Sequence, residues 1–139
     1  MFSDCSQIAE DIKTCQSAGK KILLSLGGAS PNTVIDSDSS ADSFADFLWG
    51  AFGPVQDTTL YPRPFEDAVV DGFDLDIETG GSVGYAALVN ELRTRFATDS
   101  SKTYYISAAP QCVNPDPNLS DAIENSDIDY VFVPLFYFL

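Results

Sequence analysis

A row of acidic residues occupies residues 69–78, a stretch that otherwise has the composition of a buried strand. Side chains on a strand alternate between its two faces, so residues two apart point the same way. Asp74, Asp76 and Glu78 therefore share one face. The apolar residues of the other face are Phe73, Leu75 and Ile77. A buried charge is costly unless it is paired or hydrogen-bonded, so this row indicates a function.

The three carboxyl groups are close enough together to change one another's pKa. Same-face neighbours lie roughly 6–7 Å apart, and at that range like charge and desolvation raise the pKa of at least one of them. Glu78 is the longest and outermost, which makes it the candidate general acid, with Asp76 as its partner and Asp74 deeper in the row. Two alternatives are a magnesium site of the phosphoryl-transfer type and a purely structural role. The magnesium site would need a phosphate cradle, and the sequence SLGGASPN at residues 25–32 is a poor one.

Composition excludes several other kinds of site. The 139 residues include no histidine, which removes Ser-His-Asp and Cys-His pairs and the usual histidine-ligated metals. The three cysteines, Cys5, Cys15 and Cys112, form no CxxC pair, so we expect no metal and no cofactor. Seven basic against twenty-one acidic residues give a net charge of −14, which repels phosphate backbones and anionic lipids. We therefore expect neither nucleic-acid nor membrane partners.

Helices and strands are predicted to alternate along the chain. Helical spacing of apolar residues is found at residues 6–18, 44–52, 82–96 and 120–127, and short apolar runs typical of strands at 21–28, 69–78, 103–110 and 129–136. This alternation predicts an α/β fold with parallel strands covered by helices, either doubly wound or about half of a (β/α)8 barrel. In a barrel the acidic face would point inward and end where barrel active sites lie. Asp71, on the opposite face, would serve the start of its strand.

Several motifs, in order, resemble those of glycoside hydrolase family 18, the chitinases. Residues 71–78, DGFDLDIE, match the DGxDxDxE signature, and residues 25–28, SLGG, match the SxGG motif of an earlier strand. YISAAPQC at 105–112 and DYVFV at 129–133 resemble the next two strands of the class III, hevamine-like branch. The resemblance implies that residues 1–139 form a single partial catalytic domain, a partial (β/α)8 TIM barrel with about strands 3–6 and without the first two and last two strands.

The resemblance also implies a substrate and a mechanism. The substrate would be chitin or N-acetylglucosamine oligosaccharides, cut within the chain at β-1,4 bonds, with the sugar's own acetamido oxygen as nucleophile. Glu78, kept protonated by its crowded surroundings, would protonate the glycosidic oxygen and then activate water. Asp76 would orient the acetamido N–H and balance the developing positive charge, with help from Asp74. The alternative is a relative that binds chitin oligosaccharides without hydrolysing them.

Other expectations rest on weaker signals. Ser25, Gly27 and Gly28 either contact the sugar directly or form a strand end that needs small residues. Tyr137 matches the family's acetamido-binding tyrosine only if one residue is inserted; otherwise it packs in the core. Unpaired edges of a partial barrel favour self-association. An extracellular location is expected from the family although no signal peptide is visible, and the acidic charge and a glycosylation sequon at residues 118–120 are in keeping with it.

Overall fold

The computed structural model describes residues 5–29, 35–54 and 58–134. Its strands form one parallel sheet in sequential order: β1 (Leu23–Gly28), β2 (Gly72–Ile77), β3 (Tyr105–Ala108) and β4 (Tyr130–Val131). The helices are α1 (Ser6–Ser17), α2 (Asp38–Phe52), α3 (Tyr85–Phe96) and α4 (Ser120–Asn125). Sequential parallel strands joined through helices are the repeating unit of a (β/α)8 barrel, and the predicted α/β fold, a partial TIM barrel, is confirmed.

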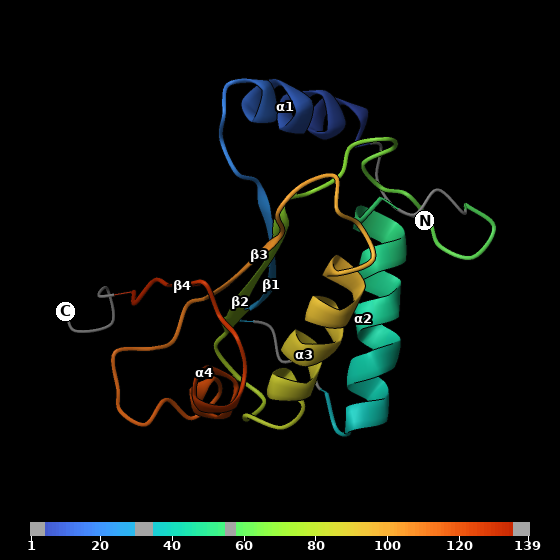
Figure 1. The fold of residues 1–139 in the computed structure, drawn as a ribbon. Helices are drawn as coiled ribbons and strands as arrows, with labels where there is room; N and C mark the ends of the chain where they lie inside the picture. The colour runs from blue at the N-terminus through green and yellow to red at the C-terminus, as the bar shows by residue number, and fades with distance from the viewer. Residues whose placement is uncertain (1–4, 30–34, 55–57, 135–139) are drawn as a thin grey trace.

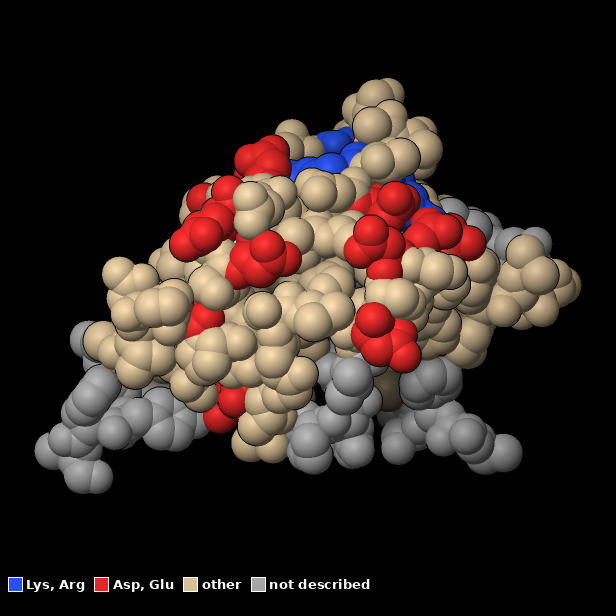
Figure 2. Space-filling view, turned by 90° about the horizontal axis from the view of Figure 1, so that it is seen from below, with Lys and Arg blue, Asp and Glu red and all other residues tan. Residues whose placement is uncertain are grey.

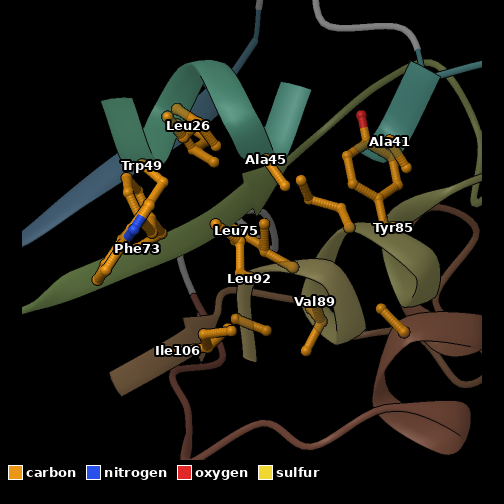
Figure 3. Close-up of a cluster of buried hydrophobic side chains, with 14 of the residues drawn as sticks. Leu26, Ala41, Ala45, Trp49, Phe73, Leu75, Tyr85, Val89, Leu92 and Ile106 are labelled. Carbon is orange, nitrogen blue, oxygen red and sulfur yellow. The ribbon is translucent and has the colours of Figure 1, made fainter. Parts of the chain in front are cut away.

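The main core lies between one face of the sheet and the helices α2 and α3, which run side by side (Figure 1). The apolar side chains of β2 (Phe73, Leu75 and Ile77) are at most 2% exposed and point into this core. Figure 3 shows Leu75 meeting Ala45 of α2 and Leu92 of α3. The predicted apolar face of α3 is also confirmed, since all five of its residues (Tyr85, Leu88, Val89, Leu92 and Phe96) are buried. Because this face of the sheet is filled by helices, the acidic face is directed to the barrel interior.

Two helices differ from their predicted form. On α1 the expected apolar face of Ile8, Ile12 and Cys15 is right for Ile12, which is buried, and wrong for the other two: Ile8 is 47% exposed and Cys15 is exposed. Ala9 and Ile12 are the buried residues, because a small alanine lets α1 approach Ala68 closely. The predicted face was built from the larger apolar residues alone and did not count alanine.

Helix α2 begins at Asp38, before the predicted start at residue 44. Ser37 accepts a hydrogen bond from the Ser40 N–H, and the Ser40 hydroxyl accepts one from the Ser37 N–H. This reciprocal capping box satisfies two N–H groups that would otherwise be unpaired at the helix end. The fourth residue of this capping box is Ser40, where Glu or Gln is usual, so the sequence did not indicate that the helix begins here.

The last strand is shorter than predicted. Among the described residues of the predicted range 129–136, which end at residue 134, pairing with β3 extends over Tyr130 and Val131. Residues 135 and 136 lie outside the described residues. From Tyr130 to Val133 the side chains are 45–59% exposed. No helix among the described residues is long and apolar enough to cross a membrane.

Candidate active site

The sheet register arranges the residues of the interior face in layers. Asp74 of β2 stands between Ser25 of β1 and Ser107 of β3. One layer further toward the strand ends, Asp76 stands beside Gly27. Parallel strands without a slip bring these residues together because their side chains alternate with the same period. The layer of Asp74 is thus rich in hydroxyl groups, whereas Asp76 has a neighbour that carries no side chain.

Asp74 is held by two serines. Ser25 Oγ donates to one carboxylate oxygen at 2.7 Å, and Ser107 Oγ donates to the other at 2.6 Å. Ser107 is 1% exposed, so water cannot take its place, whereas Ser25 is exposed. Hydrogen bonds to an ionised group are among the stronger ones in proteins. The pair therefore fixes the plane of the Asp74 carboxylate.

Asp76 faces open space. It lines a hollow of about 580 Å³ together with Asp74, Ala109 and the residues at the end of β4 (Val131, Phe132, Val133 and Pro134). Burial raises the pKa of the Asp76 carboxyl, and the charges of Glu78 and Asp74 add to the increase. The raised pKa belongs to Asp76, the residue expected to be the partner of the general acid. The hollow offers a ligand access to a group that holds a proton more readily than an ordinary aspartate does.

Glu78 lies one residue beyond the end of β2 and is partly buried. Its backbone carbonyl accepts a hydrogen bond from Gln111 Nε2 at 3.5 Å. Its carboxyl is close enough to Asp76 to influence the pKa of that residue. The three predicted carboxyl groups therefore do lie together, at the C-terminal end of the central strand.

Asp71 has the structural place expected for it. It is 4% exposed and accepts hydrogen bonds from Ile22 N–H at 2.8 Å, Gln16 Nε2 at 2.9 Å and Lys102 Nζ at 3.1 Å. Burial alone would raise the pKa of Asp71, but these donors outweigh it and hold the pKa below its usual range. Asp71 thus connects β2 to the segments that lead into β1 and β3 and lies at the start of the sheet, away from the acidic row.

The small residues of β1 have structural reasons of their own. A Cβ on Gly27 would come within 2.6 Å of the Asp76 carbonyl oxygen, and its φ of +102° is one that L-residues rarely adopt. Around Gly28 there is open space, although its φ is +77°.

Tyr137, the remaining predicted site residue, lies outside the described residues. No group of three acidic, cysteine or histidine side chains in the described part of the chain is placed to hold a metal ion.

Sequence reasoning missed Ser107 and two buried polar residues of the β3–α4 loop, Asp116 and Asn118. Strand parity could have indicated Ser107, because it lies on the same face as Asp74 once the two strands are in register. Nothing in the sequence marked Asp116. Asn118 carried only its sequon as a signal.

The motifs of this site, now placed on neighbouring strands, agree with the match of the whole chain. Residues 2–138 match the profile of the glycosyl hydrolases family 18. The chain belongs to this family. Endochitinase A of Aspergillus niger is 59% identical over 98% of this chain, which spans 11% of that relative's length.

Two solved structures show the same fold. A chitinase from Ipomoea carnea superposes with a TM-score of 0.87 and 37% identity, covering 95% of this chain and 47% of its own. A xylanase and alpha-amylase inhibitor protein from Scadoxus multiflorus superposes with a TM-score of 0.84 and 34% identity, covering 98% of this chain and 49% of its own. The chain thus spans about half the length of each of these two solved chains.

Acidic side chains are spread over the face seen from below in Figure 2, whereas basic side chains gather at one edge. This distribution accords with the net charge of −14. Such a face repels polyanions but has little effect on a neutral saccharide.

Proposed function

We propose that residues 1–139 form part of the single catalytic domain of a chitinase that hydrolyses β-1,4 bonds within chains of N-acetylglucosamine. The observation that carries the proposal is the row of three carboxyl groups at the end of β2, with Asp74 fixed by hydroxyls and Asp76 facing a hollow. The 59% identity to a relative named endochitinase supports it. The substrate would be chitin or its oligosaccharides, and an extracellular location follows from such a substrate.

Glu78 is the proposed general acid, and the substrate supplies its own nucleophile. Glu78 gives its proton to the glycosidic oxygen as the bond from that oxygen to the anomeric carbon breaks. The acetamido oxygen of the same sugar forms a bond to this carbon, giving an oxazolinium ion. Glu78, now a carboxylate, then takes a proton from water, whose oxygen attacks the anomeric carbon and reopens the ring. The configuration at this carbon is retained because it is inverted twice.

Asp76 is the proposed partner of the acetamido group. Its carboxyl would accept the acetamido N–H and, when ionised, stabilise the positive charge of the oxazolinium ion. The raised pKa of Asp76 supports this role, since a proton can move between Asp76 and its acidic neighbours as charge develops. Asp74 would keep the row oriented through its two serines.

The remaining site residues complete a saccharide subsite in this proposal. Ser25 would act through Asp74, and Gly27 and Gly28 would leave room for the sugar beside the carboxyl row. Tyr137 would donate to the acetamido oxygen. No cofactor is required by this chemistry, because the acid, the base and the nucleophile are all supplied by the chain and its substrate.

A second candidate is a protein that binds chitin oligosaccharides without hydrolysing them. The TM-score of 0.84 to a solved structure named as an inhibitor protein favours it, because this fold also occurs in proteins named for a function other than hydrolysis.

The exposed end of β4 adds a third expectation, association of copies through the sheet edge. Light scattering over a concentration series would detect that association, and a constant monomer mass would exclude it.

Hydrolysis of a fluorogenic chitotrioside tests the proposed function. We expect turnover by the chain, a loss of at least about a hundredfold in Glu78→Gln and no change in Glu10→Gln, a control on the exposed surface of α1. Titration calorimetry with chitotetraose should show similar affinity for all three proteins. Binding without any turnover would favour the second candidate, and turnover that survives Glu78→Gln would contradict the role of the acid.

A further inference from the structure

Two polar side chains are buried in the loop between β3 and α4. Asp116 is 5% exposed and Asn118 is 4% exposed. Asp116 accepts three backbone hydrogen bonds, from Gln111 N–H at 2.8 Å, Asn118 N–H at 2.8 Å and Leu119 N–H at 2.5 Å. A carboxylate with three such donors acts as the internal frame of a loop. The position of Asn118 is therefore set by Asp116.

Asn118 connects this loop to the one that follows β2. Its Oδ1 accepts a hydrogen bond of 3.0 Å from the Gly81 N–H. Gly81 comes three residues after Glu78, and both Gly80 and Gly81 have positive φ, +102° and +86°. Two consecutive glycines have more conformational freedom than other residues, so the hydrogen bond from Asn118 restrains the most flexible backbone of this loop. On the other side, Gln111 Nε2 donates to the Glu78 carbonyl.

We propose that Asn118 is a positioning residue for Glu78 and is not a glycan acceptor, although residues 118–120 form a sequon. Only 4% of Asn118 is exposed, so the neighbouring residues leave no room for a glycan on its amide nitrogen. A glycan would also pull the amide away from Gly81, whose N–H would lose its partner. Its burial and its hydrogen bond thus tie the Asn118 side chain to the loop that follows Glu78. The positioning of a catalytic group rests on the proposed function, whereas the tether itself does not.

The test separates loss of the sequon from loss of the tether. Asn118→Leu removes both at similar volume, and Ser120→Ala removes the sequon while keeping Asn118. The proteins would be secreted from a glycosylating yeast and compared by intact mass before and after endoglycosidase. Amide exchange at Gly81 and the kinetic constants for the fluorogenic chitotrioside would then be measured. Asn118→Ser, which shortens the side chain but keeps it polar, replaces the leucine variant if that variant does not fold.

We expect no glycan on Asn118 in the parent chain. In Asn118→Leu, the Gly81 amide should exchange at least about tenfold faster while those of β2 stay protected, and kcat should fall about tenfold with KM within about twofold. Ser120→Ala should match the parent throughout. A glycan on Asn118 of the active parent, the same loss in Ser120→Ala, or unchanged exchange at Gly81 would each overturn the proposal. A parent without turnover would contradict the proposed function alone, because mass and exchange still decide the tether.

Discussion

Ser107 donates a hydrogen bond of 2.6 Å to Asp74 from a position that is only 1% exposed. Ser25 donates to the other oxygen of the same carboxylate from an exposed position. We expect Ser107→Ala to lower the free energy of unfolding by about 1.5–3 kcal/mol, since no water can replace the lost donor to a charged group. Ser25→Ala should cost less than about 1 kcal/mol, because water can replace its hydroxyl. Urea denaturation measures both, and equal losses would contradict this difference.

Gly27 and Gly28 should differ in their tolerance of a side chain. Both have positive φ, which costs an L-residue about 1–2 kcal/mol, but only at Gly27 would the added Cβ meet backbone, at 2.6 Å. We therefore expect Gly28→Ala to lose about 1–2 kcal/mol of stability and Gly27→Ala clearly more. Thermal unfolding of the two variants is the measurement. A Gly28→Ala protein as unstable as Gly27→Ala would show that the close approach to Asp76 is not decisive.

Asp76 should make the fold less stable as the pH rises. The pKa of Asp76 is raised in the folded chain, so the folded chain holds this proton more tightly than the unfolded chain does. The stability that the proton contributes is present below about pH 3.9 and is lost as the pH rises through the raised pKa. Asp76→Asn removes the effect, so the variant should gain stability over the parent from pH 4 to pH 7. Urea midpoints at the two pH values would measure the gain.

Asp99 provides a control of opposite sign. Hydrogen bonds from Tyr104 and Ser101 lower its pKa, so its contribution to stability is present at neutral pH and is lost as the pH falls. Asp99→Asn should therefore lose more stability relative to the parent at pH 7 than at pH 4. The same trend in both variants would refute the assignment of the two environments.

Arg95 links the two helices that cover the sheet. It forms ion pairs with Asp42 at 2.6 Å and Asp46 at 3.0 Å on α2, and with Glu91 at 2.8 Å on its own helix. Only 14% of its side chain is exposed, so we expect Arg95→Gln to cost about 1–2 kcal/mol, above the range of isolated surface pairs. Chemical denaturation gives the value.

Lys13 is the comparison for Arg95. Its side chain is 39% exposed and pairs with Glu10 and Asp67, which are more exposed still. Lys13→Gln should change the free energy of unfolding by less than about 0.5 kcal/mol. If Lys13→Gln costs as much as Arg95→Gln, burial and the link between helices do not explain the difference.

Strand periodicity was enough to predict which side of β2 carries the acidic row. The alternation from Phe73 to Glu78 fixes both faces whatever the rest of the chain does, and the five apolar positions of α3 likewise follow from helical spacing alone. The buried side chains of α1 were not predictable in this way. Ala9 is buried in a small cluster that includes Ala68, a residue distant from it in the sequence.

The partners of the carboxyl row depend on register, which a sequence does not state. Ser107 meets Asp74 only because β2 and β3 pair without a slip. Asn118 reaches Gly81 through the path of a loop framed by Asp116. Both relationships join segments more than thirty residues apart, beyond the range of local spacing rules.

The network around Asp71 determines geometry at a distance. By bonding the backbone of Ile22 on one side and Tyr105 on the other, Asp71 sets where three strands begin relative to one another. Each residue of a strand advances it by a constant rise, so that starting alignment is carried unchanged to the far rim. The height of the carboxyl row at that rim is thus set by a buried residue at the opposite end of the sheet.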